Sequence, residues 1–186
     1  MAGVKGHTDG PEAGATFNRP INAVFNTAGD MYIADLGNSS VRIITSCGIV
    51  NTLANSIEAG GVAVDHKGNA FIIRGDVISK ITPDGAVSVF AGSGKYGTDD
   101  GTGTAASFGF PAYLAMDSHD NLFVLDGITR LLRKITPEGV VTTFAKDSAD
   151  TGLENITNMS FDQWDNLYIT HGREDLFGTI TKIATR

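Results

Sequence analysis

The chain has 186 residues, of which 41% are hydrophobic and 19% charged, so it has enough apolar material for a packed core and too little charge for a disordered chain. Its 23 glycines are about 12% of the residues, against a usual ~7%, which indicates many tight turns. The 14 basic and 21 acidic residues leave a net charge of −7, which argues against partners with dense negative charge, namely nucleic acid or an anionic membrane surface.

The first residues and the cysteine content bear on the compartment and the chemistry. Residues 1–7 contain no apolar run of the signal-peptide type, and no stretch approaches the roughly 20 apolar residues of a membrane span. Cys47 is the single cysteine, which excludes an intrachain disulfide and a cysteine-rich metal site. We therefore expect a chain located in the cytoplasm or built into a particle that is made there.

One pattern recurs four times along the chain. Each copy contains a short apolar strand, a turn rich in Asp, Asn and Gly, and a second apolar strand. A third strand follows at residues 41–44, 78–81, 132–135 and 180–183, and a fourth follows in three copies, ending at residues 53, 90 and 144. Four strands about every 45 residues are typical of propeller blades, since a lone sheet cannot bury both faces until neighbours stack on it.

These repeats predict an all-β protein. We expect one β-propeller domain over residues 1–186, with about four blades of four-stranded antiparallel sheet and an incomplete last blade. The repeat units run approximately over residues 16–54, 56–92, 107–146 and 153–186. An antiparallel sandwich is the alternative, but it does not require one pattern four times over.

A second repeat concerns the connections between the blades. Asp9-Gly10, Phe17 and Pro20 recur as Asp100-Gly101, Phe108 and Pro111 at one constant offset. We expect the two phenylalanines to anchor long surface loops onto the blades.

Taken together, these features resemble the NHL-repeat family of β-propellers. The likeness covers essentially the whole chain and lies in Phe-Gly-Phe-Pro at 108–111, Ala-Asp-Leu-Gly-Asn at 34–38, Phe-Ala-Gly at 90–92 and the Lys-Ile pairs of the third strands. The resemblance implies a propeller whose relatives commonly bind proteins or RNA, and some of which are metal-dependent lyases or hydrolases. This chain departs from the pattern in its second copy, where Ser56 and Ala59 stand in place of Phe and Pro.

Four aligned positions at the end of the second strands are candidate ligand-binding residues: Asp35, Arg74, Asp126 and His171. In a propeller they would lie near one face around the central axis. There they could bind a small polar ligand or a carbohydrate, or act as acid–base groups of a hydrolase-like or lyase-like enzyme. The alternative is that each side chain caps the hairpin that follows it.

No cofactor, metal or RNA site is expected. His66 and His119 belong to turns on the side opposite His171, so these histidines cannot supply the roughly three ligands of a catalytic zinc site. The one dense basic segment is 130–134, and strand alternation divides its side chains between two faces, which favours solvated strand residues over an RNA-binding patch.

The last copy lacks a fourth strand, so its third strand would present unpaired backbone groups at Ile180, Thr181, Lys182 and Ile183. Either residues 1–4 close the ring, or a protein partner or second subunit pairs with this edge. We predict a non-enzymatic structural or protein-binding module of a larger assembly, for example a phage or virus particle. The open last blade, with the loop at 91–111, would carry its contacts.

Overall fold

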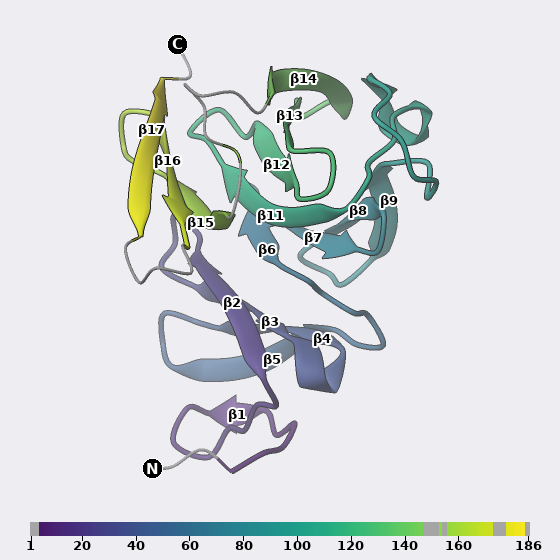
Figure 1. Ribbon diagram of the computed structural model, residues 1–186. Helices are drawn as coiled ribbons and strands as arrows, with labels where there is room; N and C mark the ends of the chain where they lie inside the picture. The colour runs from purple at the N-terminus through teal and green to yellow at the C-terminus, as the bar shows by residue number, and fades with distance from the viewer. Residues whose placement is uncertain (1–3, 147–152, 154–155, 173–177, 185–186) are drawn as a thin grey trace. The chain divides into compact units, whose positions relative to one another are not determined.

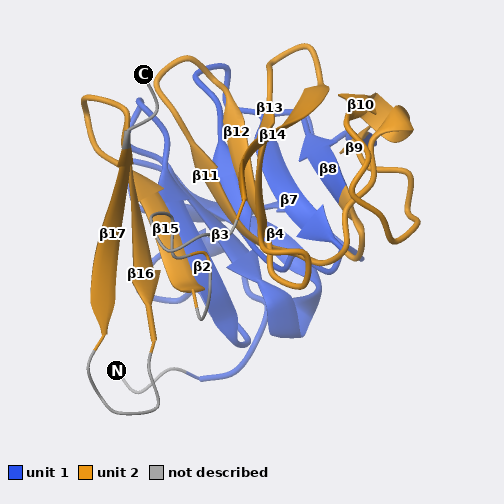
Figure 2. Ribbon diagram, turned by 45° about the horizontal axis from the view of Figure 1, so that its top comes forward, with its two compact units in different colours: residues 1–74, 78–89 blue, residues 75–77, 90–186 orange. Residues whose placement is uncertain are grey.

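A computed structural model describes residues 4–146, 153, 156–172 and 178–184, which form an all-β protein with four antiparallel sheets, the blades of a β-propeller (Figure 1). The predicted fold class is therefore confirmed. The chain divides into two compact units, Met1–Arg74 with Ile78–Val89, and Gly75–Val77 with Phe90–Arg186 (Figure 2). No helix within the described ranges is long and apolar enough to cross a membrane.

The first and third sheets each have five strands. The first has the order β1-β5-β4-β3-β2, built from β1 (Gly10–Pro11), β2 (Pro20–Phe25), β3 (Met31–Asp35), β4 (Ser40–Ile44) and β5 (Ile49–Ala54). The third has the order β10-β14-β13-β12-β11, built from β10 (Gly101–Thr102), β11 (Pro111–Met116), β12 (Leu122–Asp126), β13 (Leu131–Ile135) and β14 (Val140–Lys146). Short 3₁₀ turns lie at Leu36–Asn38 and Gly103–Ala105.

The second and fourth sheets are smaller. The second has the order β6-β7-β8-β9, built from β6 (Val62–Val64), β7 (Ala70–Arg74), β8 (Val77–Ile81) and β9 (Val87–Ala91). The fourth has three strands in its described part, in the order β15-β16-β17, built from β15 (Ile156–Phe161), β16 (Asn166–His171) and β17 (Thr179–Ala184). The four-stranded pattern thus gains an outer two-residue strand in two sheets, because the loop before each of these sheets folds back onto its last strand, β5 or β14.

The turn between the first two strands of each sheet explains the recurring Asp and Asn residues. In the second sheet, Asp65 Oδ1 accepts hydrogen bonds from the backbone N–H groups of Lys67 and Asn69, at 2.9 and 2.8 Å. The Asn69 side chain donates to Asp65 Oδ2 at 2.7 Å, and Gly68 takes a φ of +80°. The same contacts recur around Asp117 and Asp162, so local side-chain chemistry sets these hairpins.

Each sheet has two faces with different neighbours. In the first sheet, the face that carries Tyr32 and Ala34, which we call the forward face, packs against Val62 and Ile72 of the second sheet. We call the opposite face, which carries Ile33 and Arg42, the rear face. In the second unit, Phe123 and Leu125 on the forward face of the third sheet pack in the same way against rear-face residues of the fourth: Met159, Leu167 and Ile169. Both units therefore bury their cores by stacking a forward face on the next sheet's rear face.

Candidate functional site

Arg42 is a fully buried arginine on which the loop of residues 5–17 is held. Its Nη1 donates to Thr16 O at 3.1 Å and to Asp35 Oδ2 at 3.2 Å. Its Nη2 donates to Thr8 O at 3.0 Å and to Asp9 Oδ1 at 2.6 Å, and the guanidinium lies 4.9 Å from the centre of the Phe17 ring. One side chain therefore fixes a loop through backbone, carboxylate and aromatic contacts at once.

Arg133 repeats this arrangement in the third sheet, 91 positions later. It donates to Ser107 O at 3.0 Å, Asp99 O at 2.9 Å and Asp100 Oδ1 at 2.7 Å, and it lies 5.4 Å from the Phe108 ring centre. Phe17 and Phe108 thus anchor the two loops as expected. The interpretation of segment 130–134 as solvated strand residues is wrong for Arg133, which is fully buried, because the loop covers its face of the sheet.

Sequence reasoning missed both arginines as partners of the loops. The available signal was the constant offset of 91 between the two loops, which extends through Asp35 and Asp126 to Arg42 and Arg133. This signal was not used, because a charged residue inside a predicted strand normally indicates a side chain that points into solvent.

Asp35 and Asp126, two of the candidate ligand-binding residues, are buried and engaged in the same arrangement. Asp35 accepts hydrogen bonds from the Asn18 N–H at 2.8 Å and the Asn38 side chain at 2.7 Å, besides that from Arg42. Asp126 accepts hydrogen bonds from the backbone N–H groups of Gly109, Phe110 and Thr129. These contacts favour the capping interpretation for the two aspartates.

Arg74 and His171 belong to the two sheets that carry no such arginine. The positions equivalent to Arg42 are Ser79 in the second sheet and Thr181 in the fourth. His171 Nε2 lies 3.0 Å from Thr181 Oγ1, and Arg74 is exposed at the end of β7. Since Arg74 and His171 lie in different compact units, as do Asp35 and Asp126, a shared site for the four residues stays a prediction.

Asp9 and Asp100 are the carboxylates that pair with Arg42 and Arg133, and these contacts stabilise their charged form. Desolvation raises the pKa of Asp9, but hydrogen bonds from Arg42 and Thr52 outweigh it, so the pKa falls below its ordinary value of 3.8. Desolvation likewise raises the pKa of Asp100, and hydrogen bonds from Thr143 and Arg133 again produce a net lowering. Both carboxylates are therefore ionised at neutral pH.

The strand that was predicted to bind a partner, β17, lies at the edge of its sheet. It pairs with β16 along its whole length, from Asn166↔Ala184 to His171↔Thr179, and no strand of the described chain pairs with its other side. Ile180 is 70% exposed and Lys182 is exposed, while Thr181 and Ile183 are half-buried. The alternative closure by residues 1–4 involves residues 1–3, which lie outside the described residues.

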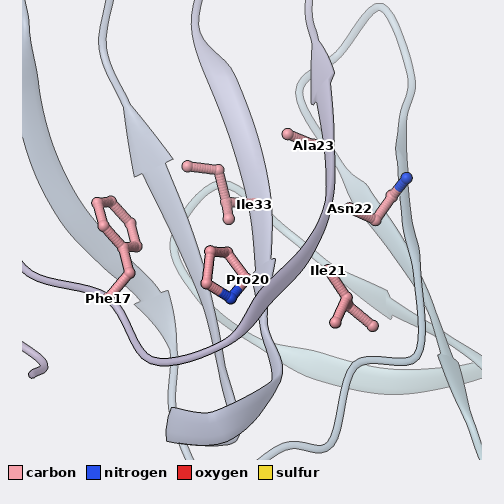
Figure 3. A pocket seen from close by; sticks show the side chains of 6 residues that line it. All are labelled: Phe17, Pro20, Ile21, Asn22, Ala23 and Ile33. Carbon is pink, nitrogen blue, oxygen red and sulfur yellow. The ribbon is translucent and has the colours of Figure 1, made fainter. Parts of the chain in front are cut away.

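A hollow of about 410 Å³ lies beside β2 in the first unit (Figure 3). Its lining is mostly apolar and comes from a loop residue, Phe17, from residues 20–23 and from Ile33 of β3. The Asn22 side chain in this wall accepts a hydrogen bond from the Val62 N–H at 2.9 Å. Within the described residues, no group of three or more His, Cys, Asp or Glu side chains could hold a metal ion.

Comparisons with known proteins support the fold. No family model and no curated protein matches the chain, so membership of the NHL-repeat family stays a prediction. Solved propeller structures do match. An auxiliary nutrient binding protein from Bacteroides thetaiotaomicron is 18% identical with a TM-score of 0.62, over 80% of this chain and 44% of its own.

Two enzymes are similar as well. A virginiamycin B lyase from Staphylococcus aureus is 16% identical with a TM-score of 0.61, over 90% of this chain and 57% of its own. A gluconolactonase from Xanthomonas campestris is 16% identical with a TM-score of 0.68, over 91% of this chain and 59% of its own. The chain thus spans about half the length of the structures it matches, and identities this low establish the fold alone.

These two similarities contradict the prediction that the chain is not an enzyme. That prediction rested on the incomplete last blade and on the lack of side chains that converge on one site. Propellers that share this fold include a lyase and a lactonase, so the fold itself is compatible with catalysis.

Proposed function

We propose that this chain is a protein-binding β-propeller module that takes up an extended segment of a partner along the free edge of β17. The observation that carries the proposal is that β17, a strand of six residues, pairs on one side only among the residues that the structure describes. Its second edge offers a row of backbone donors and acceptors, and an extended chain satisfies such a row by adding a strand. Main-chain pairing supplies the affinity in this mode, and side chains supply the selectivity.

The other sheets indicate what kind of segment fits. The strand equivalent to β17 is followed there by a fourth strand: Ile-Val-Asn-Thr-Leu-Ala in β5, Val-Ser-Val-Phe-Ala in β9 and Val-Val-Thr-Thr-Phe-Ala-Lys in β14. Each is rich in β-branched residues and has a bulky apolar residue just before an alanine. We therefore expect the partner to present a Val- and Thr-rich extended segment of this form.

An aromatic contact in the third sheet supports a bulky apolar residue in the partner's segment. Phe144 of β14 meets Phe123 edge-to-face, with ring centres 5.1 Å apart. Tyr168 is the residue of the fourth sheet equivalent to Phe123. It is half-buried, and Lys182 Nζ lies 5.7 Å from the centre of its ring. An aromatic side chain in the incoming segment would reach Tyr168 in the same way.

A labelled peptide with the sequence of residues 139–146, Gly-Val-Val-Thr-Thr-Phe-Ala-Lys, tests the proposal directly. We expect it to bind with a Kd of roughly 1–100 μM, measured by fluorescence anisotropy. The matched control replaces Thr142 of the peptide by proline, which removes a backbone donor and the extended pairing. Equal binding of both peptides, or of neither, would overturn strand addition at β17.

A pair of proline variants of the chain locates the binding edge. Adjacent N–H groups of a strand point to opposite sides, so one of Thr181→Pro and Lys182→Pro removes a donor to β16 and the other removes one on the free edge. The variant that retains the wild-type unfolding midpoint is expected to lose the peptide at least tenfold. Unchanged peptide affinity in that variant would count against the proposal, whereas the less stable variant serves as the folding control.

The comparisons favour one second function, ligand binding or catalysis of the kind their descriptions name. Arg74 and His171 are then the residues to test, because Ser79 and Thr181 stand in their sheets at the positions where Arg42 and Arg133 hold the loops. Gluconolactone is the probe, with acid release on hydrolysis as the measurement. Activity that falls tenfold or more in Arg74→Ala or His171→Ala would support this function, and no release above the buffer rate would exclude it for this substrate.

A further inference from the structure

Three large apolar side chains that are exposed in the described chain lie together at one end of the third sheet. Tyr96, in the loop that docks on Arg133, is 67% exposed, and Phe110, just before β11, is 55% exposed. Ile128, in the turn between β12 and β13, is 60% exposed. All three belong to the compact unit that contains Phe90–Arg186, drawn in orange in Figure 2, so their mutual arrangement is that of one unit. We call these three residues the apolar patch.

Two glycines connect the backbone segments that carry the apolar patch. A Cβ built on Gly109 would lie 3.1 Å from Tyr96 Cε2, and Phe110 follows Gly109 in the chain. A Cβ built on Gly127 would lie 3.6 Å from Phe110 Cδ1, and Ile128 follows Gly127. The Gly127 N–H also donates a hydrogen bond to Phe110 O at 2.8 Å. The three side chains therefore stand on segments that contact one another and form one surface, in contrast to apolar residues scattered singly.

The first sheet builds the equivalent arrangement without apolar side chains. Lys5, Arg19 and Gly37 stand 91 residues before the three patch positions, and all three are exposed. Lys5 forms an isolated parallel bridge with Phe17, and the tyrosine of the patch forms the same bridge with Phe108. A loop of this kind therefore docks without apolar residues at these positions. A role in binding explains the apolar patch better than a role in folding.

Basic side chains border the apolar patch. Lys95 precedes Tyr96 in the loop, Arg130 lies in the turn between β12 and β13, and both are exposed. The acidic residues of the same loop and turn are engaged by the chain itself: Asp99 by Ser107, Asp100 by Arg133 and Asp126 by backbone N–H groups. An apolar centre with a basic border, in a chain of net charge −7, complements a partner that carries apolar and acidic side chains.

We propose that the apolar patch binds a segment of a partner protein in which aromatic or aliphatic residues alternate with Asp and Glu. The apolar residues of this segment pack on Tyr96 and Phe110, and its carboxylates face Lys95 and Arg130. The contact uses side chains of loops and turns, whereas the proposed function uses the backbone edge of β17. The inference therefore goes beyond the proposed function and is tested separately.

A labelled peptide with the sequence Glu-Phe-Glu-Leu-Glu-Phe-Glu measures the interaction by fluorescence anisotropy. We expect a Kd of roughly 10–100 μM in low salt, and weaker binding as the salt concentration rises from about 20 to about 300 mM. Two control peptides carry lysine in place of every glutamate or serine in place of every apolar residue. Neither control is expected to bind measurably, and binding of either as tight as that of the acidic peptide would contradict the proposal.

Alanine variants locate the binding surface. Tyr96→Ala and Phe110→Ala each remove an exposed ring and are expected to weaken binding of the acidic peptide about fivefold or more. Trp164→Ala removes an exposed ring from the turn between β15 and β16 of the same unit, so it is the matched control and should retain the wild-type affinity. Equal affinities of the three variants would overturn the proposal.

A charge reversal tests the basic border. Lys95→Glu is expected to weaken binding of the acidic peptide about threefold or more in low salt and to have little effect at about 300 mM salt. Lys67→Glu changes the net charge by the same amount at an exposed lysine of the other unit and should leave the affinity unchanged. Equal weakening by both variants would mean that net charge, and not the patch, determines binding.

Hydroxyl-radical footprinting measures the exposure of the patch in solution. Tyr96 and Phe110 are expected to be oxidised in the free chain and protected by the acidic peptide, whereas Trp164 is oxidised in both samples. Protection of Tyr96 in the free chain would overturn the proposal, as would the absence of peptide binding. Binding of phosphatidylglycerol vesicles without peptide binding would assign the patch to a membrane surface and overturn it as well.

Competition separates this proposal from the one on β17. An excess of the unlabelled 139–146 peptide is expected not to displace the acidic peptide. Displacement would assign the acidic peptide to the β17 edge and remove the present proposal. Failure of the 139–146 peptide to bind, with normal binding of the acidic peptide, would remove only the β17 proposal.

Discussion

At the scale of single residues, two buried arginines explain much of the acidic and aromatic pattern of the loops. Arg42 and Arg133 each replace the hydration of a guanidinium by backbone carbonyls and carboxylates of a docked loop. Their Nε atoms have no hydrogen-bond partner among the described residues, so the Nη donors carry the whole interaction. An arginine is suited to this role because its planar fork reaches several acceptors at once.

Removal of Arg133 is expected to destabilise the protein strongly. Arg133→Met fills the volume but leaves Ser107 O and Asp99 O without a donor, which costs about 2–4 kcal/mol of unfolding free energy. Lys134→Met, one residue along the same strand and only half-buried, is the matched control and should cost less than about 1 kcal/mol. Denaturant unfolding measures both, and equal losses would contradict the role assigned to Arg133.

The pairing of Asp100 with Arg133 predicts a loss of stability in acid. Because the pKa of Asp100 is lowered in the folded chain, its contribution is present above the ordinary pKa of 3.8 and disappears as the pH falls through the folded pKa. Its side chain is half exposed, so solvent screening keeps this contribution modest.

Thermal unfolding of wild type and Asp100→Asn between pH 7 and about pH 2 measures this effect. The wild type should unfold at the higher temperature near neutrality, and the difference should shrink toward the acid end. A difference that does not change with pH would show that charge on Asp100 does not stabilise the loop.

At the scale of elements, the loops before the first and third sheets behave as parts of those sheets. Each adds a two-residue strand to the outer edge, β1 to β5 and β10 to β14. From the last strand of each sheet, the hydroxyls of Thr52 and Thr143 donate hydrogen bonds to the aspartates that pair with the buried arginines. The acceptors are Asp9 and Asp100, at 3.0 and 3.1 Å. Loop, third strand and last strand are therefore connected through one carboxylate in each sheet.

Gly92 is expected to be essential at the start of the second of these loops. It has a φ of +103°, and an added Cβ would lie 2.8 Å from Asp76 O, so Gly92→Ala meets both backbone strain and a backbone clash. Gly94→Ala is the matched control, because Gly94 has a φ of +72° but its nearest atom would be 3.8 Å away.

We expect Gly94→Ala to cost about 1–2 kcal/mol of unfolding free energy, and Gly92→Ala to cost clearly more. Denaturant unfolding of the two variants gives the comparison. Similar losses would mean that the loop start can shift to relieve the clash.

At the scale of the whole molecule, stability comes from stacked sheet faces. Phe123 is fully buried and meets Phe144 and Phe161 edge-to-face at 5.1 and 4.9 Å, where the third and fourth sheets pack together. The solved structures that match the chain support the same arrangement of strands at 16–18% identity, because such a fold requires apolar strands and turns rather than particular residues.

Phe123→Ala is accordingly expected to cost about 3–5 kcal/mol of unfolding free energy, through lost burial and the cavity that it leaves. Phe110→Ala, at a ring that is 55% exposed, is the control and should cost less than about 1 kcal/mol. Thermal or denaturant unfolding distinguishes them, and a small loss at Phe123 would mean that the two sheets repack around the missing ring.

Much of the fold could be predicted from local patterns. The strands and their turns follow from short apolar runs separated by Asp, Asn and Gly, whose side chains form the turn contacts without help from distant residues. The recurrence of that unit, at Asn69 and Asn121 for example, was enough to predict stacked four-stranded sheets. Cys47 is the single cysteine and is exposed, so the sequence alone excludes an intrachain disulfide.

The candidate site was less predictable. Alignment of the repeats placed Asp35, Arg74, Asp126 and His171 in one class, although the two aspartates differ from the others in accepting hydrogen bonds from a docked loop in the described structure. Whether a carboxylate at the end of a strand binds a ligand or a neighbouring backbone depends on what folds over it. That information lies in contacts between residues far apart in the chain, such as Gly109 with Asp126.

The sequence by itself determined the strands, the turns and the fourfold repeat, since these depend on residues within a few positions of one another. The tertiary structure alone decided that Arg42 and Arg133 are buried and that Asp9 and Asp100 pair with them. The physical reason is that burial and ion pairing depend on which surfaces meet, and the paired residues, 33 positions apart in the chain, meet through the docking of loops on sheets.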